Sequence, residues 1–106
     1  MKLESLGSSR DDLVAMPERV RHDMGLDLMR VQYGGDPCDF KPMPTVGAGV
    51  YEIRVRDVSG AYRVMYVAKF DETVYVLHAF QKKTQQTVRS DIEMGKTRYK
   101  LIGARR

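Results

Sequence analysis

The sequence has 106 residues, a length that supports one hydrophobic core, so we expect no second domain within it. Hydrophobic residues make up 42% and charged residues 30%, a composition that excludes wholesale disorder and a coiled coil. The formal net charge of +4 is uneven: residues 1–49 carry a balance of −2 and residues 50–106 a balance of +6, so we expect the second half to face phosphate, an acidic protein or an anionic membrane.

Signals for targeting, membrane insertion and metal binding are absent from the sequence. No apolar run approaches the roughly 20 residues that cross a bilayer, and Glu4 falls where a signal peptide needs apolar residues. We therefore expect one cytoplasmic domain over residues 1–106, with no membrane partner. Cys38 has no second cysteine, and Cys38, His22 and His78 are not at metal-ligand spacing, so we expect no metal and no cofactor.

The first third of the chain predicts a short edge strand and two helices. We place the strand at residues 2–6, with Leu3 turned inward. Residues 8–12 combine serines with following acids, which favour a helix start. Pro17 ends this helix and begins a second one, which Gly34 terminates. The apolar stripe of the second helix consists of Val20, Met24, Leu28 and Val31.

The rest of the chain predicts a loop, three strands and a helix. Residues 35–49 contain three prolines and three glycines, so we expect no regular element there. The apolar period then changes to two, and residues 50–56, 61–69 and 74–80 form an antiparallel meander. A last helix follows after residue 87. The order (β)ααβββα predicts an α+β fold, an antiparallel sheet with helices packed on one face.

Strand register gathers basic side chains on the other face of this sheet. If Arg56 faces Ala61, Arg54 lies directly opposite Arg63, although facing like charges cost a few tenths of a kcal/mol or more. A two-residue reversal before the third strand then places Phe80 opposite Arg63. The predicted constellation on this open face is Arg54, Arg56, Arg63 and Lys82, with His78 at its margin.

Two interpretations of this face follow from the residues alone. It is a solvated sheet face partly neutralised by Glu52 and Asp57, or it is a phosphate-binding face. Under the second interpretation, Arg63 points outward, so we expect it to be required for activity and dispensable for folding. His78 is a hydrogen-bonded core residue or a site residue, and Tyr99 is equally open.

Several segments resemble the HigB-like, phage-derived branch of the RelE/ParE toxin superfamily. They are residues 41–44, 47–49, 50–56, 62–67 and 76–85, and the likeness extends over roughly residues 8–101. The resemblance implies a RelE-like fold and the toxin of a type II toxin–antitoxin system. Such toxins are typically ribosome-dependent mRNA endoribonucleases, or mRNA interferases. The implied partners are a cognate helix-turn-helix antitoxin and mRNA on the ribosome.

The resemblance also suggests roles for individual residues. Arg54, Arg56 and Arg63 match the strand positions where the superfamily has basic residues, and Lys82 or Lys83 matches its basic position after the last strand. We assign catalysis to Arg54, Arg56, Arg63 and Lys82. We assign substrate binding to Lys83, His78 and Tyr99. RNA carries its own 2′-OH nucleophile, so these residues can work by orientation and by stabilising charge on the phosphorane, without a metal. The general base and acid stay open among Tyr99, His78, a lysine and the ribosome.

Fold membership alone leaves two other functions open. The ParE branch shares the fold and inhibits DNA gyrase by binding, without nuclease chemistry. A phage-derived RNA- or protein-binding module that has lost toxin activity is the other alternative. The density of strand arginines favours the nuclease.

Overall fold

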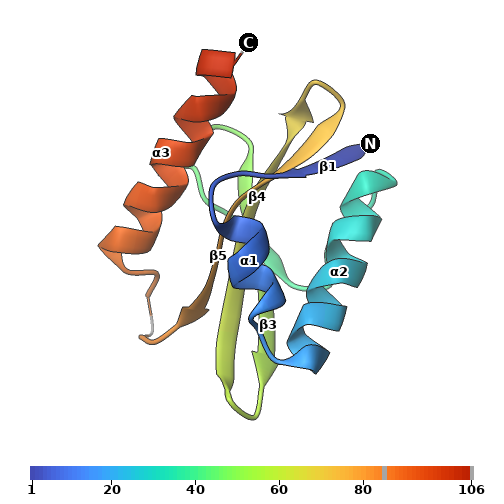
Figure 1. Ribbon diagram of the computed structural model, residues 1–106, viewed down its shortest axis with the longest axis vertical. Coiled ribbons are helices and arrows are strands. Elements are labelled where there is room, and N and C mark those ends of the chain that lie inside the picture. Colours follow the sequence, from blue (N-terminus) through green and yellow to red (C-terminus); the bar gives the residue numbers. More distant parts are fainter. Residues whose placement is uncertain (85, 106) are drawn as a thin grey trace.

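The computed structural model describes residues 1–84 and 86–105, and over these residues a five-stranded sheet is combined with three helices (Figure 1). The strands are β1 (Lys2–Ser5), β2 (Phe40–Pro42), β3 (Val50–Asp57), β4 (Gly60–Phe70) and β5 (Thr73–Lys82), and the helices are α1 (Ser9–Val14), α2 (Glu18–Gln32) and α3 (Arg89–Arg105). The α+β class is confirmed, and the architecture is compatible with a RelE-like fold.

The sheet is mixed, with the strand order β1-β5-β4-β3-β2. The meander of β3, β4 and β5 is antiparallel as predicted, but β1 runs parallel to β5, so the expectation of a wholly antiparallel sheet was wrong. The early strand is confirmed, but Leu3 does not turn inward, because its side chain is 46% exposed at the sheet edge.

A strand lies within the segment predicted as a loop. β2 pairs antiparallel with β3, and Lys41 lies opposite Glu52. Proline is tolerated here because β2 is the edge strand of the sheet, where the N–H that Pro42 lacks is not needed for pairing. The prediction that residues 35–49 hold no regular element was therefore wrong.

The predicted register of both hairpins is confirmed over the half of the sheet that carries the arginines. Arg54 pairs with Arg63, and Arg63 pairs with Phe80. A β-bulge after Met65 then shifts the pairing of β4 with β5. The bulge leaves the side-chain faces of the arginine-bearing half as the sequence predicted.

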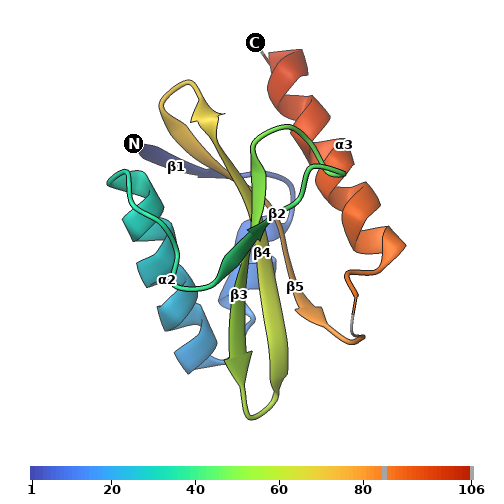
Figure 2. The same ribbon diagram turned by 180° about the vertical axis from the view of Figure 1, so that it is seen from behind.

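The helices pack on the sheet through two separate cores. Figures 1 and 2 show α1 in front of the strands in one view and behind them in the other. The α2 stripe packs in the same core as Ile53, Val64 and Val76, so α1 and α2 share one face as predicted. α3 instead packs through Ile102 against Met65, whose side chain points the opposite way from that of Val64.

None of the helices in the described part of the chain is long and apolar enough to cross a bilayer.

Candidate functional site

The sheet face under α3 changes from apolar to cationic along the strands. Cross-strand pairing divides it into rows, which are Val50 with Val67, then Glu52 with Met65 and His78, then Arg54 with Arg63 and Phe80, and last Arg56 with Ala61 and Lys82. The first rows lie in the core packed by α3. The last rows extend beyond that core, where Arg54 and Lys82 are half-buried and Arg56 is exposed. The structure thus brings the four predicted catalytic residues together.

Arg63 departs from the predicted outward position. Its side chain is only 2% exposed and its Nε lies 3.4 Å from Oε1 of Glu52, which is fully buried. The Nη1 of Arg63 also donates to the carbonyl of Tyr62 at 3.0 Å. Thr87 of the segment before α3 donates to the second carboxylate oxygen of Glu52 at 3.0 Å. The expectation of an outward Arg63 was wrong, because this segment and its contacts lie over that part of the face.

The cations of this face act on one another electrostatically. Burial lowers the pKa of Arg63, Glu52 raises it, and the nearby Arg54 and Arg56 lower it again. Burial also lowers the pKa of Lys82, and the positive charges of Arg63 and Lys41 lower it further. Lys82 is therefore more readily deprotonated than an ordinary lysine.

Lys41 is a member of the site that the sequence did not reveal. It lies on β2 directly opposite Glu52, and its charge acts on Lys82. Sequence reasoning missed it because its segment was expected to be a loop, and the pairing of a three-residue edge strand leaves almost no local signal. We name the set Lys41, Arg54, Arg56, Arg63 and Lys82 the cationic cluster.

His78 lies at the border between the covered and the open part of the face. It is 9% exposed, and its Nε2 lies 2.7 Å from Oδ1 of Asp91 on α3. Its ring stacks on Phe80 with centroids 4.7 Å apart and planes 17° apart. His78 is thus a hydrogen-bonded core residue whose ring adjoins the cationic cluster.

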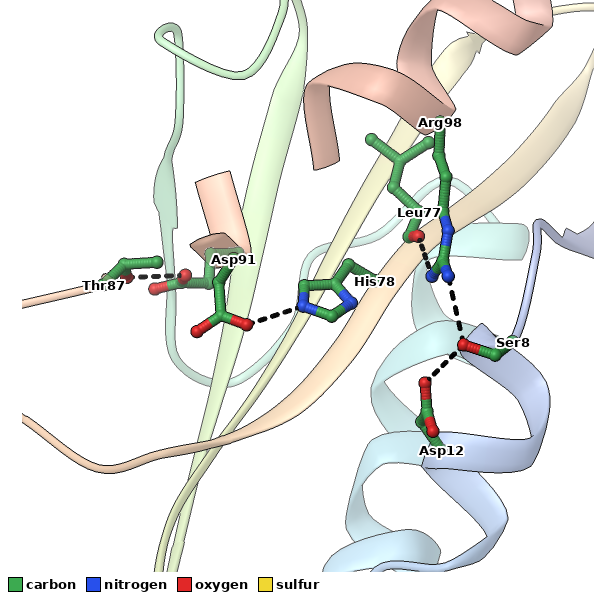
Figure 3. A network of polar contacts seen from close by, with 8 residues as sticks. Ser8, Asp12, Leu77, His78, Thr87, Asp91 and Arg98 are labelled. Carbon is green, nitrogen blue, oxygen red and sulfur yellow. Dashed lines mark hydrogen bonds and ion pairs between the residues drawn. The ribbon is translucent and has the colours of Figure 1, made fainter. Parts of the chain in front are cut away.

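α3 is fixed to the sheet by a polar network that joins three elements (Figure 3). Arg98 is 8% exposed and donates to the carbonyl of Leu77 and to the hydroxyl of Ser8, both at 3.0 Å. Ser8 in turn donates to Asp12 at 2.8 Å. Gly7 has φ of 57° and lies so near Arg98 that a Cβ would come 2.5 Å from its Nε. No local pattern in the sequence predicts this network, which ties α3 to β5 and to the segment before α1.

The other two predicted substrate-binding residues, Tyr99 and Lys83, lie in different surroundings. Tyr99 donates its hydroxyl to the carbonyl of Ala48 at 2.9 Å, and its ring lies against Gly47. These contacts place Tyr99 at the covered end, away from the cationic cluster. Lys83 is exposed directly after Lys82.

The site offers positive charges and one amine, that of Lys82, whose pKa is lowered. Within residues 1–84 and 86–105 no group of three or more histidine, cysteine or acidic side chains is arranged to hold a metal ion. The cationic cluster can attract phosphate, and Glu52, the one carboxylate in direct contact with it among the described residues, is buried beneath it.

A family of known proteins matches most of the chain. The family described as phage derived protein Gp49-like (DUF891) matches residues 11–100. No curated protein matches the sequence. The matched range includes every residue of the cationic cluster, together with His78, Phe80 and Asp91.

Proposed function

The chain belongs to the Gp49-like family of phage-derived proteins, and on that premise we propose that it is the toxin of a type II toxin–antitoxin pair that cuts mRNA on the ribosome. The family is part of the clan of RelE- and HigB-like toxins. The observation that carries the proposal is the cationic cluster, in which four strands bring five cations to one open end of a sheet face.

The proposed reaction is transesterification by the 2′-OH of the RNA. Such a reaction requires the nucleophile to be held in line with the phosphate and the developing negative charge to be stabilised. Arg54 and Arg56 reach solvent and can contact the phosphate oxygens. Arg63 is buried, so we assign it a positioning role: its positive charge and its contact with Glu52 act on the neighbouring cations rather than on the RNA directly.

Lys82 is the group best suited to remove the proton from the 2′-OH. Its pKa is lowered by burial and by neighbouring cations, so a larger fraction of it is the neutral amine at physiological pH. A base is most effective when its pKa lies near the working pH. The clustering of cations therefore both binds phosphate and activates this lysine.

The proposed partner is a helix-turn-helix antitoxin that covers the cationic cluster. An acidic segment over this surface would gain charge complementarity and at the same time exclude RNA. Hydrogen exchange of the complex should show protection in β3, β4 and β5. Protection confined to residues 10–35 would contradict this mode of inhibition.

The proposed function is tested with purified protein, ribosomes and a defined mRNA. We expect cleavage that leaves a 5′-hydroxyl on the downstream fragment, which a kinase must phosphorylate before ligation. Arg56→Ala should reduce cleavage, and Arg10→Ala on the exposed surface of α1 serves as a charge-matched control. Fragments with a 5′-phosphate would overturn the chemistry. Absence of cleavage together with inhibition of DNA gyrase would show that the protein acts as a ParE-like gyrase inhibitor instead.

A further inference from the structure

An aromatic side chain lies in the middle of the cationic cluster. Phe80 is directly opposite Arg63, and Lys82 follows it on the same face of β5. Phe80 is half-buried rather than enclosed, unlike Met65 in the neighbouring row, which is fully buried. Aromatic rings that alternate with cations are the pattern by which proteins hold single-stranded nucleic acid.

The Phe80 ring is held in a fixed orientation by a chain of contacts. His78 covers one of its faces in a nearly parallel stack, with centroids 4.7 Å apart. Asp91 of α3 fixes His78 through the 2.7 Å hydrogen bond to Nε2 (Figure 3). The Phe80 side chain also packs against the core beneath α3. Lys82 follows Phe80 on the same side of β5, so we expect the ring face away from His78 to be the one that a ligand reaches. A ring prepared in this way loses little conformational freedom when a ligand stacks on it.

Space for a ligand lies along the outer edge of β5. Among the described strands only β1 runs beside this edge, and its pairing ends at Val76. Beyond that point a hollow of about 670 Å³ opens beside the strand. It is lined by Asp12, Ala15, Met16 and Pro17 and by Tyr62, Ala79 and Gln81, which belong to the sheet face that α1 and α2 cover. Only His78 and Phe80 reach it from the cationic face. The hollow therefore gives access to Phe80 from the edge of β5.

We propose that Phe80, backed by His78 and Asp91, is the stacking platform for one base of the RNA substrate. This assignment rests on the proposed function and adds a base-binding element to its phosphate-binding cations. Every nucleobase has a π-face, so the platform orients the strand without selecting one base. The base would stack on the free face of the ring while its phosphates contact Arg54, Arg56 or Lys82.

Equilibrium binding separates stacking from charge. The probe is a labelled single-stranded oligoadenylate of about 12 nucleotides, and inorganic polyphosphate serves as a polyanion without bases. Phe80→Leu should weaken oligoadenylate binding roughly 5- to 100-fold, with the same salt dependence as the wild type and no change for polyphosphate. Arg56→Ala should instead weaken binding of both probes and lower the salt slope.

A direct signal comes from tryptophan fluorescence, because the natural sequence contains no tryptophan. Phe80→Trp keeps an aromatic platform, and oligoadenylate should quench its emission while polyphosphate should not. Phe70→Trp at the far end of β4, where the ring packs on Tyr99, is the matched control and should not be quenched. Both tryptophan variants are compared at equal folded fraction by urea unfolding.

The outcomes distinguish this inference from the proposed function. If Phe80→Leu binds oligoadenylate like the wild type, or if Phe80→Trp is not quenched, the stacking platform is overturned, whatever the ribosome assay shows. If the wild-type protein fails to cut mRNA on ribosomes, the proposed function is overturned, and quenching of Phe80→Trp still decides whether Phe80 stacks on a base.

Discussion

The two ends of one sheet face carry opposite kinds of residue on the same three strands. At the covered end, Val67 and Leu77 pack beneath α3 and are fully buried. At the open end, Arg56 and Lys82 lie in one cross-strand row, on either side of Ala61, and both reach solvent. The covered end therefore contributes stability through apolar burial, whereas the open end keeps cations together despite their mutual repulsion.

The boundary between the two ends is a buried ion pair. Glu52 belongs to the row beneath α3, and Arg63 belongs to the cationic row beside it. Among the described atoms, Arg63 Nε and Glu52 Oε1 have no hydrogen-bond partner and face each other at 3.4 Å. The cations of the open end therefore depend on Glu52, one carboxylate at the edge of the apolar core.

The largest effect is expected from Glu52→Gln. This variant leaves Arg63 buried without a counterion, and removal of one partner of a buried pair costs about 3–5 kcal/mol. We expect the free energy of unfolding in urea to fall by that amount, whereas Glu93→Gln on the exposed side of α3 should change it by less than about 0.5 kcal/mol. Arg63→Ala should be destabilising for the same reason, contrary to the expectation from the sequence.

The double variant Glu52→Gln with Arg63→Met tests the cause. Replacing both charges removes the buried cation, so most of the stability should return. Glu52→Gln and Arg63→Met are also measured singly. If the double variant loses as much unfolding free energy as these two variants together, the buried ion pair is not the source of the stability.

The next effect concerns proton removal at the open end. Lys82→Arg keeps the positive charge but cannot supply a neutral amine, so cleavage should fall by about 10²- to 10⁴-fold. In the wild type the neutral fraction of Lys82 rises with pH, so the single-turnover rate should increase with pH and level off above its lowered pKa. Lys83→Arg is the control, and equal activity of the two variants would argue against Lys82 as the base.

Smaller effects are expected from the exposed cations. Arg54→Ala and Arg56→Ala should each lower the salt slope of RNA binding by about one, because each removes one phosphate contact. Their stability should change by no more than about 0.5 kcal/mol, in contrast to substitutions of the buried pair. Binding measured across a series of salt concentrations checks this prediction. An unchanged slope in both variants would show that the open end does not contact phosphate.

The smallest effect is expected at the covered end. Tyr99→Phe removes the hydrogen bond to the Ala48 carbonyl and should cost about 0.5–1.5 kcal/mol of unfolding free energy. RNA cleavage by the folded variant should equal that of the wild type. A selective loss of cleavage would restore Tyr99 to the site, as the resemblance suggested.

The sequence alone determined the helix and the strands in which apolar residues recur at a regular spacing. The α2 stripe repeats at helical spacing, and all four of its residues are buried. Alternation and two short turns fixed the hairpin registers, so the pairing of Arg54 with Arg63 and of Arg63 with Phe80 was predictable before the structure. These features depend on residues close together in the chain, which is why they can be read from it.

Only the tertiary structure shows which segments cover the sheet face that carries the cationic cluster, and which residue from another strand belongs to that cluster. Thr87, which precedes α3, reaches Glu52 across 35 positions of sequence, and this contact, with the burial of Arg63, has no local signal. The same holds for β1, which pairs parallel with β5, and for Lys41, which joins the cationic cluster through a three-residue edge strand. Alternation assigns a side chain to one face of a sheet, but only the packing of distant segments determines whether that face is open to solvent.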